Sequence, residues 1–183
     1  ESGRPTANLA EFGYNILLGQ EGKLLKGELI HCIHHPEGQP RQVTLRENRL
    51  MALQDPALEG VWMHYETDTE PGSSGAPLYN NQWQIVGIHH AGVEKRDNEG
   101  NILAIGGARW TPEMGERQKW WYANEGLRIS RFLAHVEAQV NAEPGAAQGG
   151  ERIVSEAGRA LFAAMLKLSQ QRSTPPPPVV PDR

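Results

Sequence analysis

The feature that most restricts the fold is a series of short β-type runs between residues 28 and 92. The runs read LIHCIHH, QVTL, RLMAL, VWMHYET and WQIVGIHH. Glycines interrupt the series at intervals of 11 to 22 residues, at positions 27, 38, 60 and 72. Short strands joined by frequent turns predict an antiparallel barrel or sandwich, because βαβ units require helical segments between their strands.

Beyond residue 92 the pattern changes from strands to helices. ILAIGGARW and ANEGLRIS are further β candidates, and the polar loop TPEMGERQKWW lies between them. Ser130 fits the N-cap of a helix whose apolar residues Phe132, Leu133, Val136 and Val140 recur at helical spacing. A second helix is expected after NAEPGAAQGG, and TPPPPVVPDR is typical of a polyproline linker or tail.

The predicted organisation is therefore a β region followed by helices. Its segments are a β-barrel at 1–128, a packing helix at 129–141, a linker at 142–150, an extra helix at 151–170 and a Pro-rich linker or tail at 171–183.

Composition argues against two classes of partner. The chain has 183 residues, of which 38% are hydrophobic and 22% charged, and its formal net charge is −4. No basic block is present, so nucleic acid and membrane surfaces are not expected to bind. The start ESGRPTANLAEF has neither an initiator Met nor an apolar signal stretch, which suggests a fragment or processed chain. The single Cys32 favours a reducing, cytoplasmic setting.

The stretch EPGSSGAP, residues 70–77, is the strongest candidate for chemistry. A serine hydroxyl becomes a nucleophile only when a base takes its proton and preorganised donors meet the oxyanion. Glycines at 72 and 75 allow a sharp turn and leave amide N–H groups open, so the amides of Gly72 and Ser74 are candidate donors and Ser74 is the candidate nucleophile. A Gly/Ser/Pro β-turn between strands is the alternative interpretation.

The longer stretch YETDTEPGSSGAPLYNNQWQIVGIHHAG resembles the nucleophile region of trypsin-like serine peptidases, particularly the bacterial branch related to glutamyl endopeptidases. IHHPEGQPRQVTL upstream and NEGLRIS downstream are similar to the same branch. The resemblance covers about residues 12 to 140. It implies a mainly β fold in which this chain is the second of two six-stranded antiparallel barrels, with C-terminal helices.

The resemblance also assigns the catalytic roles. It implies that Ser74 is the nucleophile and that the amides of Gly72 and Ser74 form the oxyanion hole. In this family the general-base His and the orienting Asp come from the first barrel, and the chain begins where that barrel should have ended. The expected partner is therefore an N-terminal barrel fragment carrying His and Asp. No cofactor is implied.

The chain's own histidines are poor substitutes for that base. They lie at positions 31, 34, 35, 64, 89, 90 and 135. His35 precedes Pro36 and is expected to be a turn or packing residue. The cluster at 31–35 lacks paired ligands elsewhere at known spacing, so no metal site is predicted. Loss of the base typically costs about a million-fold in turnover, so the chain alone should be almost inert.

The resemblance places four residues around the substrate side chain that precedes the scissile bond: Asp68, Thr69, His89 and His90. A His and a Thr matching His89 and Thr69 hold a carboxylate in glutamyl endopeptidases. Asp68 matches the acidic residue that lets trypsin accept Lys or Arg, although an Asx-turn hydrogen bond is an alternative role for it. We expect the preferred substrate residue before the scissile bond to be acidic, with a basic residue as the second choice.

The sequence thus predicts a serine endopeptidase chain that acts on a protein or peptide. Trp120 and Trp121 would rim the cleft or pack in the core. The alternative is a non-catalytic β-barrel that presents its Pro-rich tail to groove-binding domains. Further domains beyond the tail are possible partners in either case.

Overall fold

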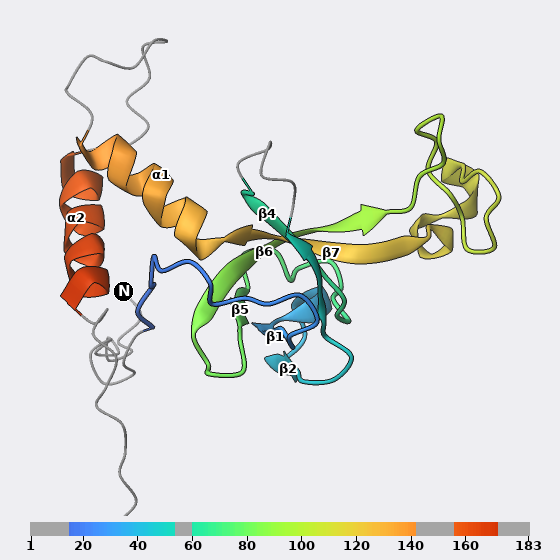
Figure 1. Ribbon diagram of the computed structural model, residues 1–183. Helices are drawn as coiled ribbons and strands as arrows, with labels where there is room; N and C mark the ends of the chain where they lie inside the picture. Colours follow the sequence, from blue (N-terminus) through green and yellow to red (C-terminus); the bar gives the residue numbers. More distant parts are fainter. Residues whose placement is uncertain (1–14, 54–59, 142–155, 172–183) are drawn as a thin grey trace, which may run out of the picture.

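The computed structural model describes residues 15–53, 60–141 and 156–171. Within these residues seven strands form one curled antiparallel sheet in the order β2-β1-β5-β6-β7-β4-β3 (Figure 1). The strands are β1 His31–His34, β2 Gln42–Thr44, β3 Leu50–Leu53, β4 Trp62–Tyr65, β5 Pro77–Tyr79, β6 Ile85–Glu94 and β7 Trp121–Arg128. The predicted mainly β architecture with C-terminal helices is confirmed.

The two ends of the sheet are joined by the residues that precede β1 and β3. Leu29 and Arg49 form an isolated antiparallel bridge. The amide of Ile30 donates to the Asn48 carbonyl at 2.6 Å, and the amide of Leu50 donates to the Glu28 carbonyl at 2.8 Å. β2 pairs with β1, and the residues just before β3 pair with the residues just before β1. β2 and β3 therefore correspond to one edge strand that is interrupted between residues 45 and 49. This interruption explains why seven strands are seen in the described residues where six were predicted.

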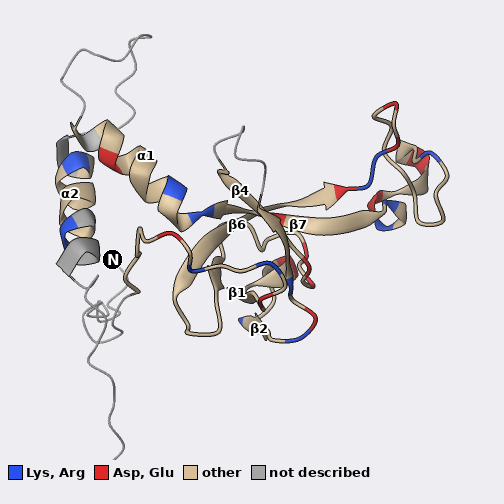
Figure 2. Ribbon diagram, viewed as in Figure 1, with Lys and Arg blue, Asp and Glu red and all other residues tan. Residues whose placement is uncertain are grey.

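The interior of the curled sheet is filled by side chains from nearly every strand. The fully buried members include Cys32, Met63, Tyr65 and Leu78. Burial also raises the pKa of the Cys32 thiol to about 12, so this thiol stays protonated and packs as an apolar group. Charged residues lie mainly on the loops and helices, and the strands are largely uncharged (Figure 2).

Helix α1, Ile129–Asn141, begins directly after β7 and packs against the outside of the barrel. Its residues Ile129 and Leu133 form a second apolar cluster with Tyr79 and Ile85. The prediction that Ser130 caps this helix is wrong, because the helix already begins at Ile129 and Ser130 lies in its first turn. The strand leads straight into the helix without a loop residue to serve as a cap.

Helix α2, Glu156–Gln171, lies beside α1 (Figure 1). The predicted linker at 142–150, the predicted start of the extra helix at 151–155 and most of the predicted Pro-rich tail lie outside the described residues. Neither described helix is both long and apolar enough to span a membrane.

The β6–β7 hairpin extends away from the barrel as an arm (Figure 1). The predicted β run at 102–110 forms only isolated bridges there, because a turn interrupts it at Gly106 and Gly107, whose φ angles are +94° and +90°. Lys119 lies over the rings of Trp110 and Trp121, with its ammonium 4.4 Å and 5.2 Å from their centroids. These contacts order the tip of the arm.

Candidate active site

The turn that carries Ser74 joins β4 to β5 and is held by backbone hydrogen bonds. The amide of Ser73 donates to the Glu70 carbonyl at 3.1 Å, and the amide of Ala76 donates to the Ser73 carbonyl at 3.1 Å. Strand β6 holds the far side of the turn, because the amide of Gly75 donates to the His89 carbonyl at 2.9 Å. The turn is therefore fixed at both ends rather than being a solvated loop.

Gly72 occupies a backbone conformation that a side chain would disturb. Its φ angle is +97°, and a Cβ added to it would lie 3.2 Å from the carbonyl oxygen of His35. Among the described residues, neither the Gly72 amide nor the Ser74 amide has an acceptor. These two N–H groups flank Ser73 and are available to an incoming oxyanion.

The Ser74 hydroxyl is solvent-exposed and donates to the main-chain carbonyl of His90 at 3.1 Å. All seven histidines lie in the described part of the chain, and no ring nitrogen of theirs is hydrogen-bonded to this hydroxyl. The Ser74 hydroxyl thus donates its proton in a hydrogen bond to a main-chain carbonyl oxygen, which cannot act as the general base.

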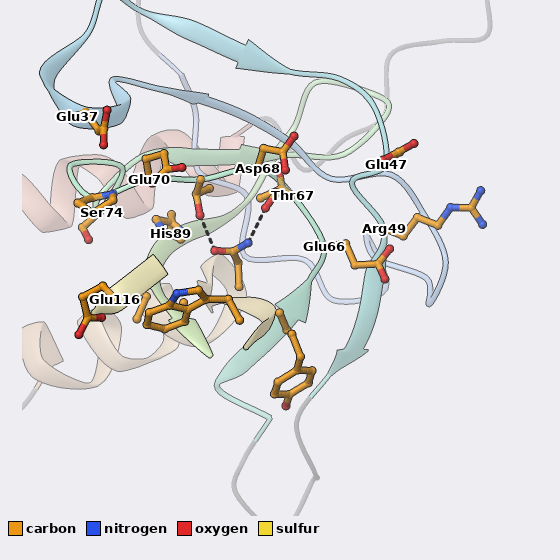
Figure 3. A pocket seen from close by; sticks show the side chains of 18 of the residues that line it. Glu37, Glu47, Arg49, Glu66, Thr67, Asp68, Glu70, Ser74, His89 and Glu116 are labelled. Carbon is orange, nitrogen blue, oxygen red and sulfur yellow. Dashed lines mark hydrogen bonds between the residues drawn. The ribbon is translucent and has the colours of Figure 1, made fainter. Parts of the chain in front are cut away.

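A cavity of about 1240 Å³ opens beside Ser74 (Figure 3). Ser74 and three of the predicted substrate-binding residues, Asp68, Thr69 and His89, line it, together with Trp121 and other residues of the arm. Asp68 is exposed, and no hydrogen bond of its carboxylate is found among the described residues, so it makes no Asx turn there.

His90 lies away from this cavity. Its ring stacks on Trp62 with centroids 4.9 Å apart, and its Nε2 lies 3.9 Å from the carboxylate of Glu125. The same carboxylate is 3.1 Å from Nε2 of His64. His89 is buried beside Tyr65, whereas His90 is exposed and stacks on Trp62, and a β-bulge interrupts the strand between His89 and Ala91. No group of three or more His, Cys, Asp or Glu side chains in the described residues is arranged to hold a metal ion.

His89 is buried in the wall of the cavity, and its ring is hydrogen-bonded to a residue that the sequence pattern did not indicate. The Tyr65 hydroxyl lies 2.6 Å from His89 Nδ1, and both side chains are buried. Burial, with smaller contributions from His34 and His90, lowers the pKa of His89 to about 4, and burial raises the pKa of Tyr65. At neutral pH Tyr65 donates to Nδ1, so the proton of the neutral imidazole is on Nε2.

Asn124 is a second residue of the site that no sequence pattern indicated. Its side-chain oxygen accepts from the Thr69 hydroxyl at 2.5 Å, and its side-chain nitrogen donates to the Thr67 carbonyl at 2.8 Å (Figure 3). One buried amide from β7 therefore fixes the segment that precedes the nucleophile turn. Only the pairing of β7 with β4 and β6 brings it there.

Residues 8–88 match the family model described as trypsin-like peptidase domain. This part of the chain is similar to trypsin-like peptidase domains. The match includes the turn with Ser74 and most of the strands described above. The family assignment from the sequence is thereby confirmed, while the glutamyl-endopeptidase branch stays a prediction.

The chain is also similar to the uncharacterized protein y4fB of Sinorhizobium fredii (strain NBRC 101917 / NGR234). The two are 34% identical over 149 residues, which cover 76% of this chain and 22% of that protein. The chain thus spans about a fifth of the length of this relative.

Proposed function

We propose that this chain is the nucleophile-bearing part of a serine endopeptidase. The observation that carries the proposal is the exposed Ser74 hydroxyl on a hydrogen-bonded turn whose Gly72 and Ser74 amides lack acceptors in the described residues. In the proposed reaction Ser74 Oγ attacks the scissile carbonyl carbon, and the two amides stabilise the resulting oxyanion. The amine leaves with a proton from the base, and water then hydrolyses the acyl-enzyme.

The base in this proposal comes from a segment outside these 183 residues. Ser74 donates to the His90 carbonyl, and no histidine of the chain is hydrogen-bonded to its hydroxyl. We propose that an N-terminal barrel supplies the His and Asp and meets this chain where the Ser74 hydroxyl is exposed. When that His is in place, the Ser74 hydroxyl would donate to an imidazole nitrogen in place of the His90 carbonyl, and its proton would pass from Oγ to that nitrogen during the attack.

Labelling with a serine-reactive fluorophosphonate tests this proposal. The complete protein should label at Ser74, because the reagent needs an activated serine and an oxyanion hole. The 183-residue chain without the base-bearing segment should label far more slowly. Ser74→Ala should remove the label from the complete protein. If the complete protein shows no Ser74-dependent labelling, the non-catalytic module becomes the better account.

We further propose that the cavity accepts a substrate side chain with a terminal carbonyl or carboxylate oxygen, with Glu as the preferred residue before the scissile bond. His89 lines the cavity, and its Nε2–H has no acceptor among the described residues. Thr69 is held beside it by Asn124 and keeps lone pairs to accept a further hydrogen bond. A substrate oxygen would satisfy the His89 donor, whereas a substrate ammonium would leave it unpaired.

Peptide series with Glu, Gln or Lys before the scissile bond test this preference in the complete protein. Glu and Gln should be cleaved about 10-fold or more faster than Lys, which corresponds to one buried hydrogen bond. His89→Phe should remove the advantage while Ser74 still labels. Preferential cleavage after Lys would contradict the proposal and assign the selecting role to Asp68, which is exposed at the cavity edge.

A further inference from the structure

A buried histidine lies directly behind the nucleophile turn. His34 is the last residue of β1 and is 4% exposed. Its Nδ1 is 2.8 Å from the hydroxyl oxygen of Ser73, which is itself 1% exposed. Its Nε2 is buried and has no partner among the described residues. The Ser73 contact is therefore the one polar contact that fixes this ring within the described structure.

Ser73 links this histidine to both open amides. It stands between Gly72 and Ser74, and its hydroxyl oxygen also accepts from the Glu70 amide at 3.4 Å. A rotation of the Ser73 backbone would turn the peptide unit that carries the Ser74 N–H. Through the neighbouring Gly72 it would also displace the unit that carries the Gly72 N–H. The hydrogen bond to His34 opposes that rotation from the core side of the turn.

The residues that follow His34 support the same turn. The carbonyl oxygen of His35 lies against the α-carbon side of Gly72, as the 3.2 Å distance to an added Cβ shows. The amide of Glu37 donates to the Pro71 carbonyl at 2.7 Å. Three successive residues of the turn thus contact the end of β1 and the short 3-10 helix Pro36–Gly38.

We propose that His34 is a positioning residue, which holds the Gly72 and Ser74 amides in the geometry that stabilises the oxyanion by anchoring the Ser73 hydroxyl. The inference rests on the proposed peptidase function. Burial, followed by the nearby His35, lowers the pKa of His34, so the ring is neutral at neutral pH. In either neutral tautomer the Ser73 hydroxyl can complete the hydrogen bond, because a hydroxyl both donates and accepts.

Three variants of the complete protein test the role. His34→Leu removes the contact and keeps an apolar side chain of similar reach. His34→Asn keeps a polar atom on Cγ, where Nδ1 is attached in histidine, and can still bond Ser73. Ser73→Ala removes the other partner. We expect His34→Leu to lower kcat about 100-fold with KM nearly unchanged, because a small misplacement of catalytic groups costs about that much.

His34→Asn should recover most of that loss. His34→Leu combined with Ser73→Ala should lose no more than the worse single variant, because both changes break one contact. Hydrogen exchange of the peptide spanning residues 70–76 should accelerate in His34→Leu and not in His34→Asn.

Two outcomes would overturn the inference. One is an unchanged kcat in His34→Leu. The other is an equal loss in the Leu and Asn variants that follows their thermal midpoints, since this would mean a packing role only. Ser74-dependent fluorophosphonate labelling of the unmodified protein is measured in parallel. If the unmodified protein labels at Ser74 and His34→Leu keeps its kcat, only the positioning role of His34 is rejected. If the unmodified protein does not label at Ser74, the peptidase function is rejected as well.

Discussion

Ser74→Ala should lower the turnover of the complete protein about a million-fold, which is the typical cost of removing the nucleophile of a catalytic triad. The hydroxyl of Ser74 is the exposed one of the adjacent pair and borders the cavity, whereas that of Ser73 is buried against His34. Steady-state hydrolysis of a peptide substrate measures the effect, and titration with a serine-reactive reagent checks that the variant contains no unmodified enzyme.

Two other serines serve as comparisons for this prediction. Ser130 lies in α1 and lines neither depression near the turn, so Ser130→Ala should be as active as the unmodified protein. Ser73→Ala should retain far more activity than Ser74→Ala. If Ser73→Ala and Ser74→Ala were inactive to the same degree, the assignment of the nucleophile to Ser74 would lose its support.

Gly72→Ala should lower kcat about 100-fold to 1000-fold, the range found when one oxyanion donor is removed. The φ angle of +97° is unfavourable for alanine, and the new Cβ would approach the His35 carbonyl to 3.2 Å. The turn must shift to relieve this contact, and the amides of Gly72 and Ser74 shift with it. The expected loss is in kcat and in the rate of fluorophosphonate labelling, with KM changing little.

Gly106→Ala is the matched control for Gly72→Ala. Gly106 has a nearly equal φ angle of +94°, but an added Cβ meets nothing within 4 Å. This variant therefore has the backbone strain, about 1–3 kcal/mol, without the displaced turn. It should lose stability in denaturant unfolding and keep its kcat. A similar loss of kcat in both variants would indicate that strain alone, and not the position of the amides, lowers the activity.

Local sequence patterns were sufficient to predict most of the strands and helices. The runs at residues 29–35 and 83–90 contain β1 and much of β6, since period-two burial is a local property of a strand. The short strand β5 was not predicted, because its first residue, Pro77, was assigned to the Gly/Ser/Pro stretch at residues 70–77. The helix start was misplaced at Ser130 because a residue with capping chemistry follows a strand that continues directly into the helix.

Local sequence patterns predicted only some of the residues of the candidate site. Ser74, Gly72 and the cavity residues Thr69 and His89 could be selected because they lie close together in one motif-rich stretch. Tyr65 and Asn124 could not, since their partners are 24 and 55 residues away along the chain. His34 was not selected either, because only the folded turn brings Ser73, 39 residues later, into contact with it.

The sequence by itself determined that the chain is mainly β and that residues 70–77 form a turn resembling that of trypsin-like peptidases, because strand period and turn chemistry are encoded by neighbouring residues. Tertiary structure decided which histidine faces the cavity, which one supports the turn and which one stacks on Trp62. It also decided that the Ser74 hydroxyl donates to a carbonyl and not to an imidazole. Those outcomes depend on strand pairing and burial, which join residues that no local pattern connects.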